Sequence, residues 1–418
     1  MQAALVGKYF GFMVTQNPKQ QADAAVYEPA TAVILCLRGD DPSLNDCLNS
    51  LLAQDYPSFE IHFVLDSQQD PALDRLQGFL ADNADSTIKT KTIFLTDDQG
   101  DSSKILQSCS LKNQALIAAV SDADDSIEVF ALVDADGVVD KNWLTELTKP
   151  LSDPKVAVSS GSRWFAPRRR NPGSIVRQTW NAAALPQMNF YNIPWGGALA
   201  IRRSAIDSCD LLSHWSHGFC EDTMLPEILA KSDFKIAHVP SVIVESDEST
   251  SLASAMNWIS RQLLTVRLHH RSWPLVLGHA VFSGLCLVAG ITTVICCMWQ
   301  QHYFQGVRLA LVIAAFLIGN VALLQMIQVA NRRGSIVLNR KPGHATSAGA
   351  STVSRGPRFL GSLLTQLLYP LIAIKAALMR EVQWRGITYS IGPGKKISME
   401  QYRPYHTPDE KKLDDTSL

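Results

Sequence analysis

Two aspartates one residue apart, Asp134 and Asp136, directly follow the apolar run VFALV at residues 129–133. If that run is a buried strand, both carboxylates can point into one crevice, where burying them without a counter-charge is costly. A divalent cation removes this cost, and Mg²⁺ or Mn²⁺ prefers oxygen ligands and leaves room for phosphate oxygens. Aspartate is also common in surface turns and at helix caps. The residue types and their spacing therefore allow either a metal site or a plain turn.

A second acidic pair, Glu221 and Asp222, stands in the segment GFCEDTMLPEIL, just before an apolar helical pattern. A carboxylate at such a place can act as a general base if a partly apolar site raises its pKa. Acidic residues are also favoured at helix N-termini by the helix macrodipole. Both interpretations stay open on the residues alone.

The tripeptide Trp195-Gly196-Gly197 is a further candidate. Paired glycines let a backbone approach a ligand closely, and a tryptophan face can stack on a sugar or line a slot for an acceptor. The alternative is an ordinary turn. We expect these three residues to belong to a binding site.

Residues 31–248 read as alternating strands and helices, which predicts an α/β domain with a mostly parallel sheet covered on both faces. The expected strands are apolar runs, at residues 31–37, 60–65, 91–95 and 129–133. In such sheets the ligand crevice lies at the carboxyl ends of the strands. Asp66 and Asp134 both fall at such an end, so the elements are expected to bring them to one edge.

A long stretch without acidic residues follows this domain. Residues 249–380 contain no Asp or Glu but twelve Lys and Arg, although the whole chain is balanced with 38 basic and 39 acidic residues. Acidic groups are costly in lipid and basic groups anchor at the cytoplasmic surface. Apolar runs at residues 275–299 and 309–330 are long enough to cross a bilayer. A third run at 359–379 is interrupted by Lys375, which leaves a tilted span, a re-entrant segment or an interfacial helix open.

The distribution of basic residues predicts the orientation. The segment between the two long apolar runs carries only Arg308, whereas residues 331–358 carry six basic residues and no acid. The positive-inside rule then places the latter loop and the α/β domain in the cytoplasm of a multi-pass membrane protein. Eight cysteines without a CxxC pair or zinc spacing are typical of buried thiols in a reducing compartment. No broad basic face that would bind nucleic acid is evident.

The segment VILCLRGDDPSLNDCLNSLLAQDYPSFEIHFVLDSQQDPA resembles the opening of family 2 glycosyltransferases, which have a GT-A fold. VDADG at residues 133–137 is similar to the family's DxD motif, and GFCEDTMLPEIL to its later acidic signature. Within the family, IPWGGALAIRRSAID and REVQWRGITY resemble the ceramide glucosyltransferase branch and its bacterial relatives, whose members transfer a sugar to a membrane lipid. The resemblance covers roughly residues 30–390.

The resemblance implies a role for each acidic residue. Asp66 would lie near the nucleotide base or ribose. Asp134 would hold the donor and, with Asp136, a Mg²⁺ or Mn²⁺ ion at the diphosphate. Asp222, beside Glu221, would be the general base that takes the proton of the acceptor hydroxyl.

The basic and aromatic candidates are less well defined. Lys112 of SLKNQAL occupies a region in which relatives contact the donor, although a solvated helix lysine fits equally. Many relatives carry Gln-x-x-Arg-Trp near the membrane, but this chain has no clean match. Arg261 or Arg267 would supply the cation that faces the diphosphate, with Trp258 beside the acceptor, unless the two arginines are interfacial anchors.

The expected activity is inverting transfer of a hexose, with glucose preferred, from a UDP-sugar to a hydroxyl of a membrane lipid, ceramide-like or glycerolipid-like. A processive polysaccharide synthase is one alternative, although the degenerate motif weighs against it. A non-catalytic membrane scaffold is the other. The expected organisation has five parts. They are an interfacial or frayed N-terminal extension at 1–28, a GT-A domain at 29–248, a basic interfacial segment at 249–274, a membrane region at 275–380 and a cytoplasmic tail at 381–418.

Overall fold

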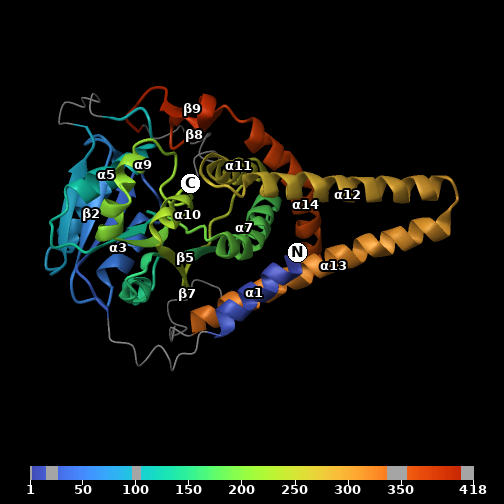
Figure 1. Ribbon diagram of the computed structural model, residues 1–418, viewed down its shortest axis with the longest axis horizontal. Helices are drawn as coiled ribbons and strands as arrows, with labels where there is room; N and C mark the ends of the chain where they lie inside the picture. The colour runs from blue at the N-terminus through green and yellow to red at the C-terminus, as the bar shows by residue number, and fades with distance from the viewer. Residues whose placement is uncertain (1, 16–26, 97–104, 337–354, 406–418) are drawn as a thin grey trace.

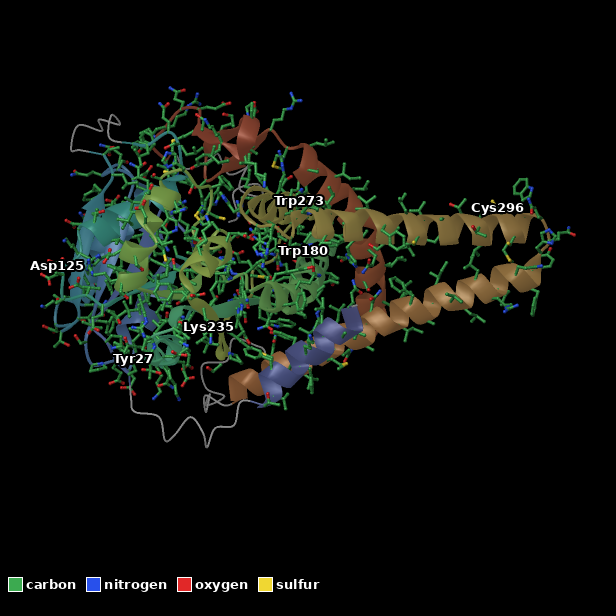
Figure 2. The ribbon with its side chains drawn as sticks, in the orientation of Figure 1. Tyr27, Asp125, Trp180, Lys235, Trp273 and Cys296 are labelled. Atoms are coloured by element: carbon green, nitrogen blue, oxygen red, sulfur yellow. The ribbon has the colours of Figure 1, made fainter. Side chains whose placement is uncertain are left out.

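The computed structural model describes residues 2–15, 27–96, 105–336 and 355–405. A layered α/β domain forms one end of the molecule, and two long helices project from the other end (Figure 1). Asp125 lies at the outer edge of the α/β domain, whereas Cys296 lies near the tip of the projecting helices (Figure 2).

The α/β domain is built on one seven-stranded sheet of order β3-β2-β1-β4-β6-β5-β7. The strands are β1 Thr31–Leu37, β2 Phe59–Leu65, β3 Lys89–Phe94, β4 Val129–Val133, β5 Val156–Phe165, β6 Ala198–Arg202 and β7 Lys235–Ser246. β1 runs parallel to both β2 and β4, while β6 runs antiparallel to β4 and β5. The predicted mostly parallel sheet is therefore confirmed, with β6 as the exception.

Two hydrophobic clusters cover the two faces of this sheet. Alternate residues of β1 go to opposite faces, Ala32 and Ile34 to one cluster and Val33 and Leu35 to the other. The surrounding helices are α3 Leu44–Leu52, α4 Pro71–Asp82, α5 Leu111–Ser121, α6 Trp143–Thr148, α7 Pro172–Tyr191, α8 Arg203–Ser208, α9 Leu211–Trp215 and α10 Leu225–Leu229. Because side chains of a strand alternate between faces, a continuous apolar strand is what a sheet buried on both sides requires.

Helices α11 Leu252–His269, α12 Trp273–Trp299, α13 Tyr303–Ile336 and α14 Arg355–Leu378 follow the sheet. In the described part of the chain, three helical segments have the length and apolar character to cross a bilayer, at Trp273–Trp299, Tyr303–Arg332 and Phe359–Leu378. The third apolar run is thus one continuous helix, and Lys375 lies near its end, where its Nζ donates to Asn257 Oδ1 at 2.7 Å. The projecting parts of α12 and α13 expose large apolar side chains such as Phe282 and Phe304, as lipid-facing helices do. The predicted basic loop at 331–358 lies largely outside the described residues.

The N-terminal segment forms helix α1 Gln2–Thr15, which lies along α13 (Figure 1). Val6 and Met13 pack with Ile327 in one buried cluster, and Tyr9 donates to Asn331 Oδ1 at 2.7 Å. α1 is therefore part of the helical bundle.

The segment after α14 folds back onto the α/β domain as a small antiparallel sheet. Its strands are β8 Glu381–Trp384, β9 Ile387–Ile391 and β10 Ile397–Met399. Val382, Ile387 and Tyr389 join the cluster on one face of the large sheet, and the Leu111 N–H donates to Tyr389 Oη at 3.2 Å. This returning sheet packs into the core, so residues 381–399 are an integral part of the α/β domain.

Candidate active site

A cavity of about 200 Å³ opens at the carboxyl ends of β1, β2 and β4. We call it the strand-end cavity. Arg38 follows β1, Asp66 follows β2 and Asp134 follows β4, and all three line it. The order β2-β1-β4 places the change of strand order beside β1, and such a point is where open α/β sheets bind ligands.

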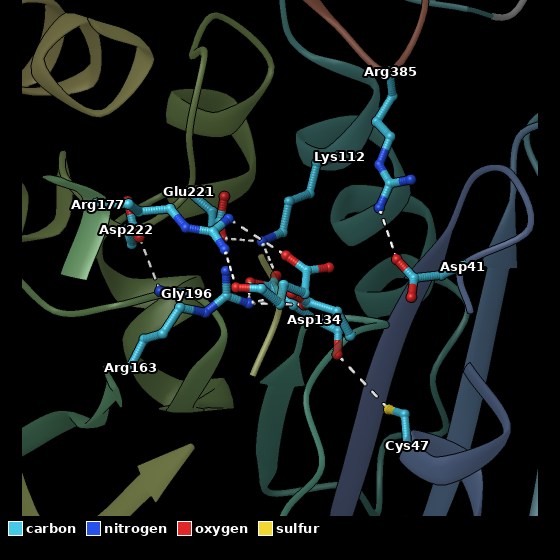
Figure 3. A network of polar contacts seen from close by, with 12 residues as sticks. Asp41, Cys47, Lys112, Asp134, Arg163, Arg177, Gly196, Glu221, Asp222 and Arg385 are labelled. Atoms are coloured by element: carbon cyan, nitrogen blue, oxygen red, sulfur yellow. Dashed lines mark hydrogen bonds and ion pairs between the residues drawn. The ribbon is translucent and has the colours of Figure 1, made fainter. Parts of the chain in front are cut away.

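Lys112 joins two of the acidic groups in this cavity (Figure 3). Its Nζ lies 2.8 Å from Asp134 Oδ1 and 2.7 Å from Glu221 Oε1. Burial opposes ionisation of Asp134, but the charges of Lys112 and Arg163 outweigh it and lower the pKa of Asp134. Burial has the larger effect on Glu221 and raises the pKa of that carboxyl in spite of Lys112.

Lys112 stands in the first turn of α5. The side chain of Ser110 caps this helix by accepting from the Asn113 N–H, and Tyr389 of the returning sheet accepts from Leu111. These contacts fix the helix start and so aim the lysine at the carboxyl ends of the strands.

Asp136 is bound by Arg163 of β5. Arg163 Nη2 lies 2.7 and 2.8 Å from the two carboxylate oxygens of Asp136 and 3.5 Å from Asp134 Oδ2. The guanidinium also lies 5.0 Å from the Trp195 ring centroid, within cation–π range. The pKa of Asp136 is raised, because burial and the charge of Asp134 together outweigh the opposing effect of Arg163.

The paired glycines lie where the acidic groups approach the backbone. The Gly196 N–H donates to Asp222 Oδ2 at 2.8 Å, and Thr223 Oγ1 donates to Asp222 Oδ1 at 2.8 Å. A Cβ at Gly196 would lie 1.9 Å from Glu221 Oε1, and one at Gly197 would lie 2.5 Å from Asp134 Oδ2. Only glycine therefore lets these carboxylates close on the backbone.

Asp66 lies at another side of the strand-end cavity. Arg38 forms an ion pair with its Oδ2, and Tyr402 Oη, beyond the returning sheet, donates to the same oxygen at 3.0 Å. Asp66 Oδ1 is buried and has no hydrogen-bond partner within the described residues. An acceptor oxygen therefore remains for a ligand.

The structure separates the two arginine candidates. Arg261 lines the strand-end cavity, and its guanidinium lies 5.2 Å from the Trp384 ring centroid. Arg267 instead donates to the carbonyls of Ala376 and Met379, at 2.8 and 2.7 Å, and ties α11 to the end of α14 away from the cavity.

Two arginines that line the cavity, Arg385 and Arg261, have one carboxylate partner or none within the described residues. Arg385, at the tip of the β8–β9 hairpin, reaches the cavity and donates to Asp41 Oδ2 at 3.2 Å (Figure 3). Arg261 forms no ion pair within the described chain, and burial, with the charge of Arg385, lowers its pKa to about 9. An anionic ligand would supply the missing counter-charge.

A second cavity of about 200 Å³ lies between α1, α7, α11, α12, α13 and α14. We call it the inter-helix cavity. Its lining is mostly apolar and includes Trp180, and Trp258 meets Trp180 edge-on with ring centroids 5.7 Å apart. The two cavities meet, because six residues line both, namely Arg163, Trp195, Asp222, Trp258, Gln262 and Thr265.

Of the two aspartates Asp134 and Asp136, only Asp134 has a carboxylate that is accessible to a divalent cation in the cavity. Within the described residues no group of three or more His, Cys, Asp or Glu side chains converges as metal ligands. Mg²⁺ is often held by only one or two carboxylates together with substrate phosphates and water. The Asp134 side chain is 25% exposed to the cavity, whereas that of Asp136 is 2% exposed and both its oxygens are taken by Arg163. The arrangement therefore fits a metal on Asp134, while Asp136 would have to exchange its arginine.

Three arginines that line the strand-end cavity, Arg38, Arg163 and Arg385, were not identified as site residues from the sequence. Arg38 could have been found, because it follows β1 as Asp66 follows β2. Arg163 carries no local signal. Arg385 stands in the segment REVQWRGITY, but β5 and the returning sheet reach the cavity only through tertiary packing, so the position of either arginine could not be predicted.

The family described as glycosyl transferase family 21 matches residues 1–397, and no curated protein matches the chain. Among solved structures, the mannosyltransferase PcManGT from Pyrobaculum calidifontis, in complex with GDP-Man and Mn²⁺, is 16% identical with a TM-score of 0.43. That match covers 90% of this chain and 98% of the other. S. aureus TarS 1–349 in complex with UDP-GlcNAc is 13% identical with a TM-score of 0.37, over 88% of this chain and 99% of the other. Because the family match runs over nearly the whole chain, this protein belongs to glycosyl transferase family 21 and is a glycosyltransferase.

Proposed function

We propose that the enzyme transfers glucose from a UDP-sugar to a hydroxyl of a membrane lipid, with inversion at the anomeric carbon. One observation carries the proposal. Asp222 lines both the strand-end cavity, which is rich in charge, and the inter-helix cavity, which is mostly apolar. A polar donor and an apolar acceptor would therefore meet at this carboxylate.

The strand-end cavity suits a nucleoside diphosphate sugar. Asp66, with its free Oδ1, would bind the nucleoside. Lys112, Arg261 and Arg385 place positive charge around the cavity, where the diphosphate would lie. A Mg²⁺ or Mn²⁺ ion on Asp134, with Asp136 near it, would neutralise charge on the leaving diphosphate.

The reaction follows from the position of Asp222. Hydrogen bonds from Gly196 and Thr223 orient its carboxylate at the junction of the cavities. It would take the proton of the acceptor hydroxyl while the hydroxyl oxygen forms a bond to the anomeric carbon. The bond from that carbon to the diphosphate oxygen breaks, UDP leaves with the electron pair, and a single displacement inverts the centre. Glu221 forms an ion pair with Lys112 and would hold the ammonium group of that lysine beside Asp134.

The acceptor would enter from the bilayer. Trp195 and Trp258 line both cavities, and Gly196 and Gly197 line the strand-end cavity beside Trp195. The aromatic faces there suit a lipid headgroup or a sugar. With α12 and α13 in the membrane as a multi-pass anchor, the basic residues of the loop at 331–358 favour a cytoplasmic α/β domain. A lipid could then reach Asp222 without leaving the bilayer.

The test is product analysis with the full-length protein in lipid nanodiscs. UDP-[¹⁴C]glucose, Mn²⁺ and a lipid extract are supplied, and the products are read by thin-layer chromatography and mass. We expect lipids heavier by one hexose, and their loss in Asp222→Asn. Asp125→Asn, at the exposed far end of the domain, should match wild type. A long glucan would instead indicate a polysaccharide synthase. The absence of both hexose transfer and UDP binding would indicate a scaffold.

A further inference from the structure

The end of the inter-helix cavity away from the sheet carries polar side chains on otherwise apolar helices. They come from four helices, and they are Gln2 of α1, His279 of α12, Asn320 of α13, and Gln366 and Tyr369 of α14. Gln2 Nε2 lies 3.1 Å from His279 Nε2. Polar residues within membrane helices are rare and usually functional, so this group needs an explanation.

Asn320 is the member whose hydrogen bonding is incomplete. The residue is 9% exposed, and its Nδ2 has no hydrogen-bond partner within the described residues. It lies on the inward face of α13, at helical spacing from the buried Leu317 and Ile327. A leucine would suit that face, whereas an amide left unpaired there is costly. A ligand oxygen in the cavity would remove the cost.

The position along the helices indicates which part of a lipid would reach this amide. Asn320 is seventeen residues from Tyr303, where α13 begins, which corresponds to about 25 Å along the helix. His279 is twenty residues from Trp299, where α12 ends, or about 30 Å. If the tip of these helices reaches the far surface of a hydrocarbon core about 30 Å thick, Asn320 lies just inside the near surface. Lipids carry their ester, amide and secondary hydroxyl groups at that depth.

We propose that this end of the cavity is a second acceptor subsite, in which Asn320 Nδ2 donates a hydrogen bond to a carbonyl or hydroxyl oxygen of the lipid. That oxygen is distinct from the hydroxyl at Asp222. The acceptor is therefore a lipid with two oxygen functions near its headgroup, such as an N-acyl or O-acyl amphiphile, rather than a long-chain alcohol with one. This inference rests on the proposed function, because it places the acceptor in the inter-helix cavity.

The test compares acceptors in nanodiscs with the full-length enzyme. The probes are a ceramide and a diacylglycerol, which carry a carbonyl near the hydroxyl, and oleyl alcohol, which does not. We expect KM for oleyl alcohol to exceed that for at least one carbonyl-bearing probe by tenfold or more. Asn320→Leu should raise KM for the preferred carbonyl-bearing probe by about 5- to 30-fold, as expected for a lost hydrogen bond. Its KM for oleyl alcohol and for UDP-glucose should stay unchanged.

A control variant on the same helix separates an effect of the cavity from a general effect of changing α13. Gln328→Leu changes an amide on α13 that does not line the cavity, and it should leave every KM unchanged. Equal KM values for all probes with the wild-type enzyme, or an equal effect of Asn320→Leu on all probes, would overturn the subsite while leaving the proposed function intact. If no probe and no lipid extract accepts hexose, both proposals fail together. The wild-type comparison needs no variant, so poor folding of Asn320→Leu would not hide the answer.

Discussion

The substitution Gly196→Ala tests whether the paired glycines exist to let carboxylates approach the backbone. A Cβ at this position would lie 1.9 Å from Glu221 Oε1, and real Cβ contacts are almost never closer than 3.0 Å, so the two groups must separate by about 1.1 Å. Glu221 cannot yield easily, because it is buried and its other partner, Lys112, lies 2.7 Å away. A misplacement of about 1 Å in an active site can cost about 100-fold in rate.

We therefore expect Gly196→Ala to lower kcat/KM for hexosyl transfer by about 100-fold. The assay is transfer of labelled glucose to lipid in nanodiscs, with the melting temperature measured alongside to show that the protein is folded. Gly78→Ala is the matched control, because Gly78 is inside helix α4 and no atom beyond its chain neighbours and the backbone of that helix lies within 4 Å of its Cβ position. Alanine there should preserve activity and add up to about 1 kcal/mol of stability. Activity of Gly196→Ala within threefold of wild type would refute the reasoning.

Four further outcomes are expected. Lys112→Met leaves the Asp134 and Glu221 carboxylates without their shared cation, so the free energy of unfolding should fall by about 3–5 kcal/mol in denaturant titrations, and an unchanged value would contradict the network. Arg385→Ala should raise KM for UDP-glucose about tenfold and weaken inhibition by UDP, with unchanged acceptor KM, and an effect on the acceptor alone would place the arginine elsewhere. EDTA should abolish transfer and Mn²⁺ restore it, whereas full activity after exhaustive chelation would argue against a metal on Asp134. Burial lowers the pKa of His238 from 6.5 to about 4, so the neutral imidazole contributes its full stability above pH 6.5 and this contribution is lost as the pH falls towards 4. The melting temperature should therefore fall over this pH range, and it should fall less in His238→Leu.

Several features could be predicted from the sequence because they depend on local pattern. Apolar runs such as those ending at Asp66 and Asp134 predicted buried parallel strands, and the carboxyl-end rule placed both aspartates at one edge. The acid-free region predicted the candidate membrane helices, because length and charge are properties of the chain itself. The packing of the returning sheet could not be predicted in this way, since the partner surface of its apolar residues, such as Leu111 against Tyr389, lies far away in the sequence.

The acidic motifs, the predicted strands and the apolar helices were thus determined by the sequence itself, through the periodicity and polarity of neighbouring residues. Tertiary structure alone decided which cations complete the site. It brought Arg163 from β5 onto Asp136 and Arg385 from the returning sheet into the strand-end cavity, and it directed Arg267 away from it. Tertiary structure also joined the two cavities at Asp222. These contacts join residues that are 27 to 344 positions apart and depend on strand order and helix packing, about which local spacing carries no information.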